Sequence, residues 1–187
     1  MIFTDLSALK ADLETNFHSL PLVSQVADIV HGEGNEQAQV MLIGEAPGYH
    51  EVVARRPFVG RSGQLLRATM TEVGLEPAGV YISNIVKARP PDNRDPDPAE
   101  IAAFKPYLDQ EIQLINPQLI ITLGRFSMAK FLPEVKISQV HGRLHKVQWQ
   151  GQRLFVLPMY HPAAALRSTQ MKTSFVTDFA KVPKILA

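Results

Sequence analysis

A long glycine-rich segment, Gly44 to Gly63, constrains the fold of this chain more than any other feature. The apolar run from Gln39 to Ile43 predicts a buried strand before it, and the pattern from Gln64 to Val73 predicts a helix after it. This order is typical of α/β sheets, which bind ligands at the carboxyl ends of their parallel strands. The segment is too long for a simple connection, so we expect it to form part of a binding site.

The rest of the chain alternates predicted strands with predicted helices. An amphipathic helix should begin at Thr4 or Asp5, and Ser62 and Asp97 should cap later helices. The further strands are predicted at Val80–Val86, Leu119–Leu123, Leu144–Trp149 and Arg153–Leu157, with the last two forming a hairpin, and a final helix follows a loop from Tyr160 to Thr169. This alternation predicts a single α/β domain over residues 1–187 with a mostly parallel sheet.

Composition excludes several classes of protein and site. The chain is 45% apolar, but no run is long enough to predict a membrane span, and the first ten residues lack the pattern of a signal peptide. The absence of cysteine excludes disulfides, thiolate zinc sites and cysteine-held iron–sulfur clusters. His141 and His145 would lie about 13 Å apart on a strand, too far to share a metal. We therefore expect a cytoplasmic protein without a metal site.

Charge is segregated along the chain although the net charge is only +1. Residues 1–54 hold one Lys or Arg and eight Asp or Glu, whereas residues 136–187 hold eight and one. The segment 55–94 is also basic, with seven against three. A basic face on a nearly neutral protein indicates a polyanionic partner such as nucleic acid, and chance distribution of surface charge is the alternative.

Four polar or aromatic residues are ambiguous when each is considered alone. Glu45 is either a solvated loop carboxylate or part of a site, and Phe58 is either a packed side chain or a stacking surface. Asn84 lies in an apolar strand, where its amide needs a local partner or a ligand. His161 precedes a proline in a loop, where histidines are common. None of the four decides the function without the others.

Four motifs in this order resemble the uracil-DNA glycosylase superfamily, and family 4 in particular. They are Gly-Glu-Ala-Pro-Gly (44–48), Pro-Phe-Val-Gly-Arg-Ser-Gly-Gln-Leu-Leu (57–66), Asn-Ile-Val-Lys-Ala-Arg-Pro-Pro-Asp-Asn-Arg (84–94) and His-Pro-Ala-Ala-Ala-Leu-Arg (161–167). Family 5 relatives have an apolar residue at the position of Glu45. The resemblance implies a three-layer α/β/α sandwich around a four-stranded, mostly parallel sheet.

The resemblance also implies roles for individual residues. Glu45 and His161 would be catalytic: the carboxylate would position the attacking water, and the imidazole would donate a hydrogen bond to uracil O2. Phe58 would stack on the extruded base, Asn84 would read its Watson–Crick edge, and Glu51 would exclude the thymine methyl group. Ala46 is the fourth substrate-binding residue. The implied DNA contacts are Arg61, Arg89, Leu166 and Arg167.

The chain departs from the resemblance at two places. The family holds a [4Fe–4S] cluster with four cysteines, and this chain has Phe17, Leu20, Ala88 and Phe104 at those positions. We predict no cofactor and a hydrophobic plug in place of the cluster. In the loop that would enter the minor groove, Ala164 and Ala165 replace bulkier residues, which favours single-stranded substrates because extruding the base costs less there.

The resulting hypothesis is a monomeric, monofunctional glycosylase that excises uracil from single- or double-stranded DNA, in the cytoplasm and associated with the nucleoid. The alternative is a non-catalytic protein that binds uracil or damaged DNA with the same pocket. Glu45 and His161 favour the enzyme, because a binding protein has no need of a carboxylate that positions water.

Overall fold

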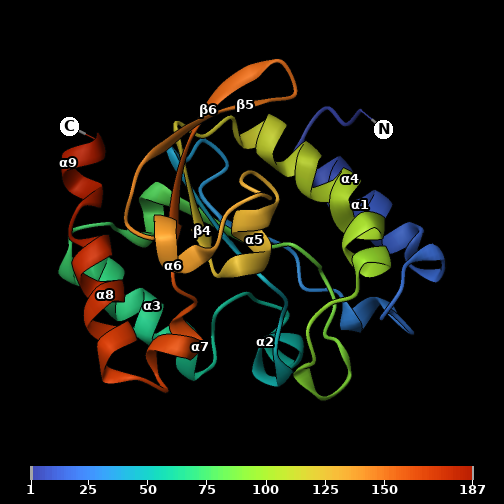
Figure 1. Cartoon of the computed structure of the whole chain (residues 1–187). Coiled ribbons are helices and arrows are strands. Elements are labelled where there is room, and N and C mark those ends of the chain that lie inside the picture. Colours follow the sequence, from blue (N-terminus) through green and yellow to red (C-terminus); the bar gives the residue numbers. More distant parts are fainter. Residues whose placement is uncertain (1, 187) are drawn as a thin grey trace.

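The computed structural model describes residues 2–186, so the domain predicted over 1–187 extends one residue beyond the described part at each end. Its centre is a sheet with strand order β1-β3-β2-β4-β6-β5. The strands are β1 (Glu33–Gly34), β2 (Val40–Gly44), β3 (Val80–Asn84), β4 (Leu119–Leu123), β5 (His145–Trp149) and β6 (Gln152–Met159). The four central strands are parallel, and the two edge strands run antiparallel to them (Figure 1).

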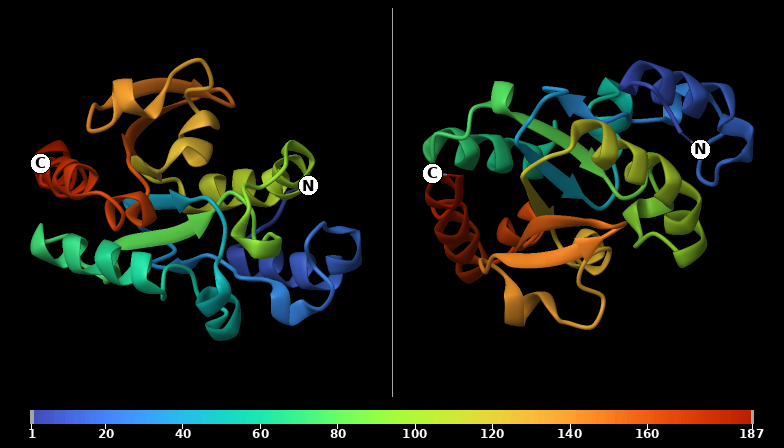
Figure 2. Two further views of the ribbon diagram at one scale, coloured as in Figure 1. Left: turned by 60° about the horizontal axis from the view of Figure 1, so that its bottom comes forward. Right: turned by 90° about the horizontal axis from the view of Figure 1, so that it is seen from above.

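Helices cover both faces of this sheet and give the predicted three-layer α/β/α sandwich. They are α1 (Leu6–Thr15), α2 (Tyr49–Ala54), α3 (Arg61–Glu72), α4 (Pro98–Ile115), α5 (Arg125–Ala129), α6 (Ile137–Val140), α7 (Pro162–Ala165), α8 (Thr169–Phe179) and α9 (Val182–Leu186). The views in Figure 2 show α1 and α4 on one side of the sheet and α3 and α8 on the other. None of the helices among residues 2–186 combines the length and hydropathy that a membrane crossing requires.

The alternation of side chains along β2 divides the hydrophobic core into two halves. Met41 and Ile43 pack with α1 and α4 in one cluster, while Val40 and Leu42 pack with α3 and α8 in the other. All five residues of β2 are buried, as expected for a central parallel strand with helices on both faces. The two clusters hold β2 rigidly, and β2 leads directly into the glycine-rich segment.

The prediction of a four-stranded sheet was wrong, because the sheet has six strands. The hairpin around Gln150 and Gly151 was predicted correctly, and its first strand, β5, forms one edge. The other edge strand, β1, is only two residues long and was not predicted as a strand. Such a short strand leaves no periodic pattern, because it depends on pairing with β3 rather than on its own sequence.

Three local predictions around the site also require correction. The glycine-rich segment contains a short helix, α2, and the loop after β6 contains α7. Helix α3 begins at Arg61 with Gly60 as its N-cap, so Ser62 lies inside the helix and does not cap it. The Gly60 N–H donates to Glu51 Oε1 at 2.8 Å, and this contact fixes where the helix begins. Gly74 ends α3 in the left-handed conformation, as predicted.

Candidate active site

The predicted site residues meet where the parallel strands end. Glu45 follows β2, Asn84 is the last residue of β3, and His161 lies just beyond β6. Gly44 and Asn84 are paired across the sheet, which brings the first two ends together. The helices that follow these ends, α2 and α7, both lie at the lower end of the view in Figure 1.

Gly44 allows an aromatic ring and an amide to approach the same point. A Cβ atom at this position would lie 2.5 Å from Phe58 Cζ and 2.4 Å from Asn84 Oδ1, so both side chains occupy the space that a larger residue would fill. The ring of Phe58 lies 5.9 Å from that of His161, with 37° between the planes. The structure therefore brings Phe58, Asn84 and His161 together from three distant segments.

Phe58 is held in an unusual backbone conformation. Its φ is +54°, in the left-handed region that non-glycine residues rarely adopt. A Cβ on Gly63 would lie 2.0 Å from Phe58 O, so the chain passes closely only because this residue is glycine. Arg67 donates from Nε to Phe58 O at 3.0 Å and from Nη2 to Pro57 O at 3.1 Å. These contacts fix the direction of the aromatic side chain.

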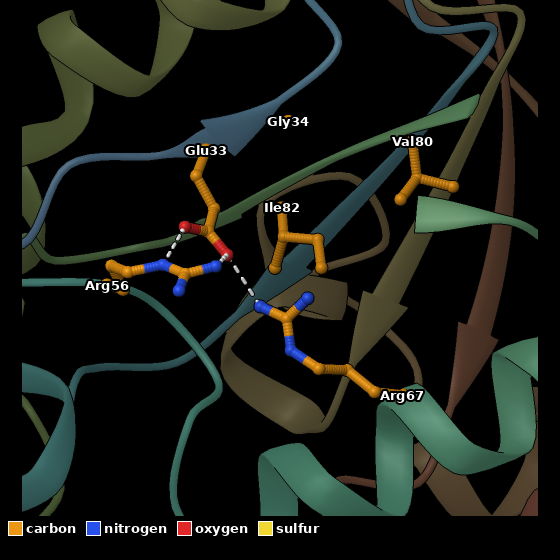
Figure 3. A pocket seen from close by; sticks show the side chains of 6 residues that line it. All are labelled: Glu33, Gly34, Arg56, Arg67, Val80 and Ile82. Carbon is orange, nitrogen blue, oxygen red and sulfur yellow. Dashed lines mark hydrogen bonds and ion pairs between the residues drawn. The ribbon is translucent and has the colours of Figure 1, made fainter. Parts of the chain in front are cut away.

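Glu33, a carboxylate on the edge strand β1, completes a clamp that consists of Glu33, Arg56 and Arg67 and holds the Phe58 segment. Glu33 accepts hydrogen bonds from Arg56 at 2.7 and 3.2 Å and from Arg67 at 2.6 Å (Figure 3). Partial burial opposes ionisation, but the hydrogen bonds from both arginines hold the pKa of Glu33 below its usual value. The group lines a pocket of about 210 Å³. Because both arginines already bind Glu33, and Arg67 also binds two backbone carbonyls, these side chains serve to anchor the Phe58 segment.

Replacing Arg67 with methionine should therefore lower kcat/KM on the predicted substrate, uracil-containing DNA, by about tenfold, because small misplacements of a binding group are costly. The carbonyl of Phe58 would lose its charged donor, while the apolar stem would remain. The matched control is Arg153→Met, which removes the same charge from an exposed position on β6. Equal activities of the two variants in steady-state assays would show that the clamp does not position Phe58.

Glu51 organises the same segment from inside. Its Oε1 accepts from the N–H groups of Val59 and Gly60 at 3.0 and 2.8 Å, and its Oε2 accepts from Gly48 N–H at 3.2 Å. The residue is buried. The carboxylate thus links the start of α2 to the start of α3. Its predicted contact with the substrate remains a prediction, and loop organisation is an additional role that the sequence did not indicate.

Asn84 presents an unsatisfied acceptor to the site. Its side chain is 3% exposed, and its buried Oδ1 has no hydrogen-bond partner. Buried polar atoms without a partner are rare in folded proteins, so each one needs an explanation. A ligand that donates a hydrogen bond at this point supplies one.

His161 is held as a neutral hydrogen-bond donor. Its Nδ1 accepts from Ala163 N–H at 3.2 Å, so the proton of the neutral ring is on Nε2. Burial and the positive charge of Arg167 lower the pKa of His161 to about 4, with the charge of Glu51 opposing them. At neutral pH the imidazole therefore offers Nε2–H without carrying a charge. Gly124, with φ +97°, lies against this side chain.

The lowered pKa of His161 predicts an acid-sensitive fold. Between about pH 6.5 and 4 the unfolded chain binds a proton at this residue and the folded chain does not, so stability is lost as the pH falls through this range. The loss is on the order of 3 kcal/mol at most. Denaturant unfolding of wild type and His161→Gln at several pH values measures it. The difference between the two proteins should change with pH in this window, and a constant difference would contradict the lowered pKa.

Glu45 is half-buried beside an ion pair. Burial and the negative charge of Asp95 raise the pKa of Glu45, while the charge of Arg125 lowers it. Asp95 and Arg125 form an ion pair with each other. Sequence reasoning missed both residues, since only their positions mark them: Asp95 directly follows the third motif, and Arg125 lies just after β4. Ala46, the neighbouring predicted substrate contact, is half-buried against the α1 and α4 side of the core.

Three of the four predicted DNA contacts are exposed, and the fourth, Arg89, is half-buried. Arg61 is the first residue of α3 and is exposed, as is Arg167. Leu166 is 43% exposed, which is high for a leucine. Arg89 donates to Asn93 Oδ1 at 2.8 Å, and its guanidinium lies 5.7 Å from the centre of the Tyr49 ring.

The positions aligned with the cluster cysteines cannot hold an iron–sulfur cluster. Leu20, Ala88 and Phe104 are buried in the hydrophobic cluster beneath α1 and α4, and Phe17 packs against it. Carbon side chains offer iron no ligand. Within residues 2–186 no group of three or more histidine, cysteine or acidic side chains is arranged to hold a metal ion.

Comparison with known proteins agrees with this geometry. The family profile described as the uracil DNA glycosylase superfamily matches residues 31–182. The chain belongs to the uracil DNA glycosylase superfamily. This match spans all four motifs, from before β1 to the first residue of α9.

Individual relatives within the superfamily differ in how much of the chain they match. A protein of Saccharolobus solfataricus named type-4 uracil-DNA glycosylase is 43% identical over 164 residues, or 84% of this chain and 76% of that protein. Another of that name from Archaeoglobus fulgidus is 40% identical over 83% of this chain and 81% of its own. A type-5 uracil-DNA glycosylase of Thermus thermophilus is 31% identical over 55% of this chain and 53% of its own. Similarity to the type-4 proteins is thus both higher and more extensive.

Proposed function

We propose that this protein is a monofunctional uracil-DNA glycosylase of the family-4 type, which hydrolyses the N-glycosidic bond of uracil in DNA and leaves an abasic site. The observation that carries the proposal is the meeting of Phe58, Asn84 and His161 at the carboxyl edge of the sheet. The names of the type-4 relatives support the substrate class.

The three side chains complement uracil in its extruded form. Phe58 is 5% exposed, and its ring would stack on the planar base once uracil enters the site. The free Oδ1 of Asn84 accepts from N3–H of uracil, and the amide nitrogen donates to O4. Cytosine has an acceptor at N3 and a donor at C4, so it reverses this pattern and leaves both groups mismatched. Extruding the base costs a few kcal/mol, and stacking on Phe58 offsets part of this cost.

The same geometry supports the chemical step. When the C1′–N1 bond breaks, its electron pair moves into uracil, and negative charge develops on O2. The Nε2–H of His161 donates to that oxygen, and a neutral donor needs no proton transfer to stabilise it. Glu45 orients a water toward C1′ and stabilises the positive charge on the sugar. The water oxygen then bonds to C1′, and its proton passes to the carboxylate.

Several parts of the proposal rest mainly on the sequence. We propose that residues 1–187 form one domain that acts as a monomer in the cytoplasm on single- or double-stranded DNA. Arg61, Arg89, Leu166 and Arg167 would contact the DNA, with Ala46 and Glu51 at the base. The four apolar residues at the cysteine positions would replace the cluster and stabilise the fold by burial.

The direct test of the proposal is strand scission of a uracil-containing oligonucleotide after alkali treatment. Wild-type protein should produce alkali-labile sites at uracil and none at cytosine or thymine in matched oligonucleotides. The alternative, a non-catalytic binder, predicts retention of the oligonucleotide in a mobility-shift assay without scission. The neutral donor at His161 and the carboxylate at Glu45 favour the enzyme, because binding alone requires neither.

A further inference from the structure

One element of the third motif has no role in the chemistry described above. Lys87 is a charged side chain only 1% exposed, and its partner Glu111 on α4 is equally buried. Their charged atoms are 2.6 Å apart. Buried ion pairs are weak stabilisers, because desolvating both charges offsets much of their attraction. This pair therefore requires an explanation other than stability.

Every N–H of the Lys87 ammonium has an acceptor. It donates to Glu111 Oε2, to Ser83 Oγ and, at 3.2 Å, to the backbone carbonyl of Asn84. Ser83 Oγ in turn donates to Glu111 Oε2 at 2.6 Å. Burial lowers the pKa of Lys87, and the negative charge of Glu111 opposes this effect. The three side chains form a network that contacts the active site through the carbonyl of Asn84.

The network and the Asn84 amide lie on opposite faces of the sheet. Side chains alternate along β3, so Ser83 points toward α4, which carries Glu111, and Asn84 points toward Phe58. The carbonyl of Asn84 lies at the strand end between them. Lys87 thus holds the backbone of Asn84 from behind, while Gly44 and Phe58 confine its side chain from the front.

Confining the Asn84 side chain matters because its acceptor, Oδ1, has no hydrogen-bond partner. With Oδ1 buried and unsatisfied, the amide would gain by turning toward any available donor. Beyond the strand end, the N–H groups of Ile85 and Val86 still donate to Gly44 O and Glu45 O, and the Lys87 ammonium adds a charged donor to the Asn84 carbonyl. A fixed carbonyl therefore keeps the amide in the orientation that a base requires before the base arrives, which reduces the cost of binding.

We propose that the buried Lys87–Glu111–Ser83 network is a positioning device that holds Asn84 ready to read the base. The inference rests on the proposed function, since it assigns the network to the selection of uracil. It predicts that the network affects base recognition only through Asn84. A network that served stability alone would affect folding and would not depend on the amide.

The test is a double-mutant cycle between the network and Asn84. Lys87→Met alone leaves Glu111 buried without its partner, and the fold is at risk. The triple variant Ser83→Ala/Lys87→Met/Glu111→Leu removes all the network's polar groups together and retains apolar volume. The matched control is Asp109→Leu/Lys130→Met, which removes another largely buried ion pair involving α4 that makes no contact with Asn84. Circular dichroism and thermal melts check that each variant is folded.

The measured quantities are kcat/KM on a uracil oligonucleotide and Kd for the same oligonucleotide carrying non-cleavable 2′-fluoro-2′-deoxyuridine. The triple variant should raise Kd about fivefold or more and lower kcat/KM about tenfold. In an Asn84→Ala background the same three changes should alter either quantity less than twofold. The control should change neither more than twofold.

Additive effects, or an unchanged Kd in the folded triple variant, would overturn the inference. The Kd measurement distinguishes failure of this inference from failure of the proposed function. If wild type cleaves nothing yet binds the uracil analogue, the proposed chemistry is wrong, and coupling in Kd still decides the role of the network. If wild type binds no uracil analogue, both are wrong.

Discussion

Replacing His161 with alanine should lower kcat on uracil-containing DNA by about 100- to 1000-fold, the range found for the loss of one donor to a developing oxyanion. The structure gives the reason, since Nδ1 is taken by the Ala163 N–H and leaves Nε2–H as the free donor. The interaction strengthens as charge builds on O2. The loss should therefore fall mainly on kcat, with KM changing little. Single-turnover measurements on a uracil oligonucleotide separate the two.

A matched variant tests whether charge on the ring matters. His161→Gln keeps a donor on a neutral side chain, and it should retain more activity than His161→Ala. Because the pKa of His161 is about 4, the wild-type rate should show no ionisation of this residue between pH 5 and 8. A titration of His161 near pH 6.5 in NMR spectra would contradict the neutral donor.

Replacing Glu45 with alanine should lower kcat by about 100-fold or more, in the range of general acid–base effects. The carboxylate acts on the water and on the sugar rather than on the base, so affinity for the uracil analogue should be retained. The activity of wild type should fall at acid pH as Glu45 becomes protonated. Since burial and Asp95 raise its pKa, that fall begins at a higher pH than for a solvated glutamate.

Asp95→Asn provides the control for this pH dependence. Removing the negative charge should lower the pKa of Glu45 and move the acid side of the rate profile to lower pH. An unchanged profile would show that another group limits the rate at acid pH. Full activity of Glu45→Ala would exclude the carboxylate from the mechanism.

The central strands and the active-site residues could be predicted from the sequence, because each of them leaves a recognisable local pattern in it. Buried parallel strands appear in the sequence as short apolar runs. Asn84 lies at the end of such a run, and Glu45, Phe58 and His161 lie in segments that follow such runs. Parallel strands bring their carboxyl ends to one edge. The meeting of the side chains is therefore a consequence of strand order, and the resemblance supplied their roles.

The contacts that support the site could not be predicted in the same way. Glu33 reaches Arg67 across 34 residues, and Lys87 reaches Glu111 across 24. Such pairs depend on which faces of distant elements are packed together, and a single sequence carries no record of this. Helix α2 was missed because Glu51, a carboxylate inside the segment, organises it by accepting hydrogen bonds from Gly48 N–H before α2 and from Gly60 N–H before α3. The short strand β1 depends likewise on its neighbour.

The cysteine positions show the opposite case, in which absence of a residue type was informative. A chain without cysteine offers no thiolate for a cluster, and the sequence alone gives this result. Only the structure shows that all four substituted positions pack at one hydrophobic cluster.

The most direct test of the account is the structure of a crystal soaked with uracil. Uracil should be stacked on Phe58, with N3–H and O4 hydrogen-bonded to the Asn84 amide and O2 hydrogen-bonded to His161 Nε2. Uracil bound elsewhere, or a pocket that stays closed to uracil at saturating concentration, would contradict it.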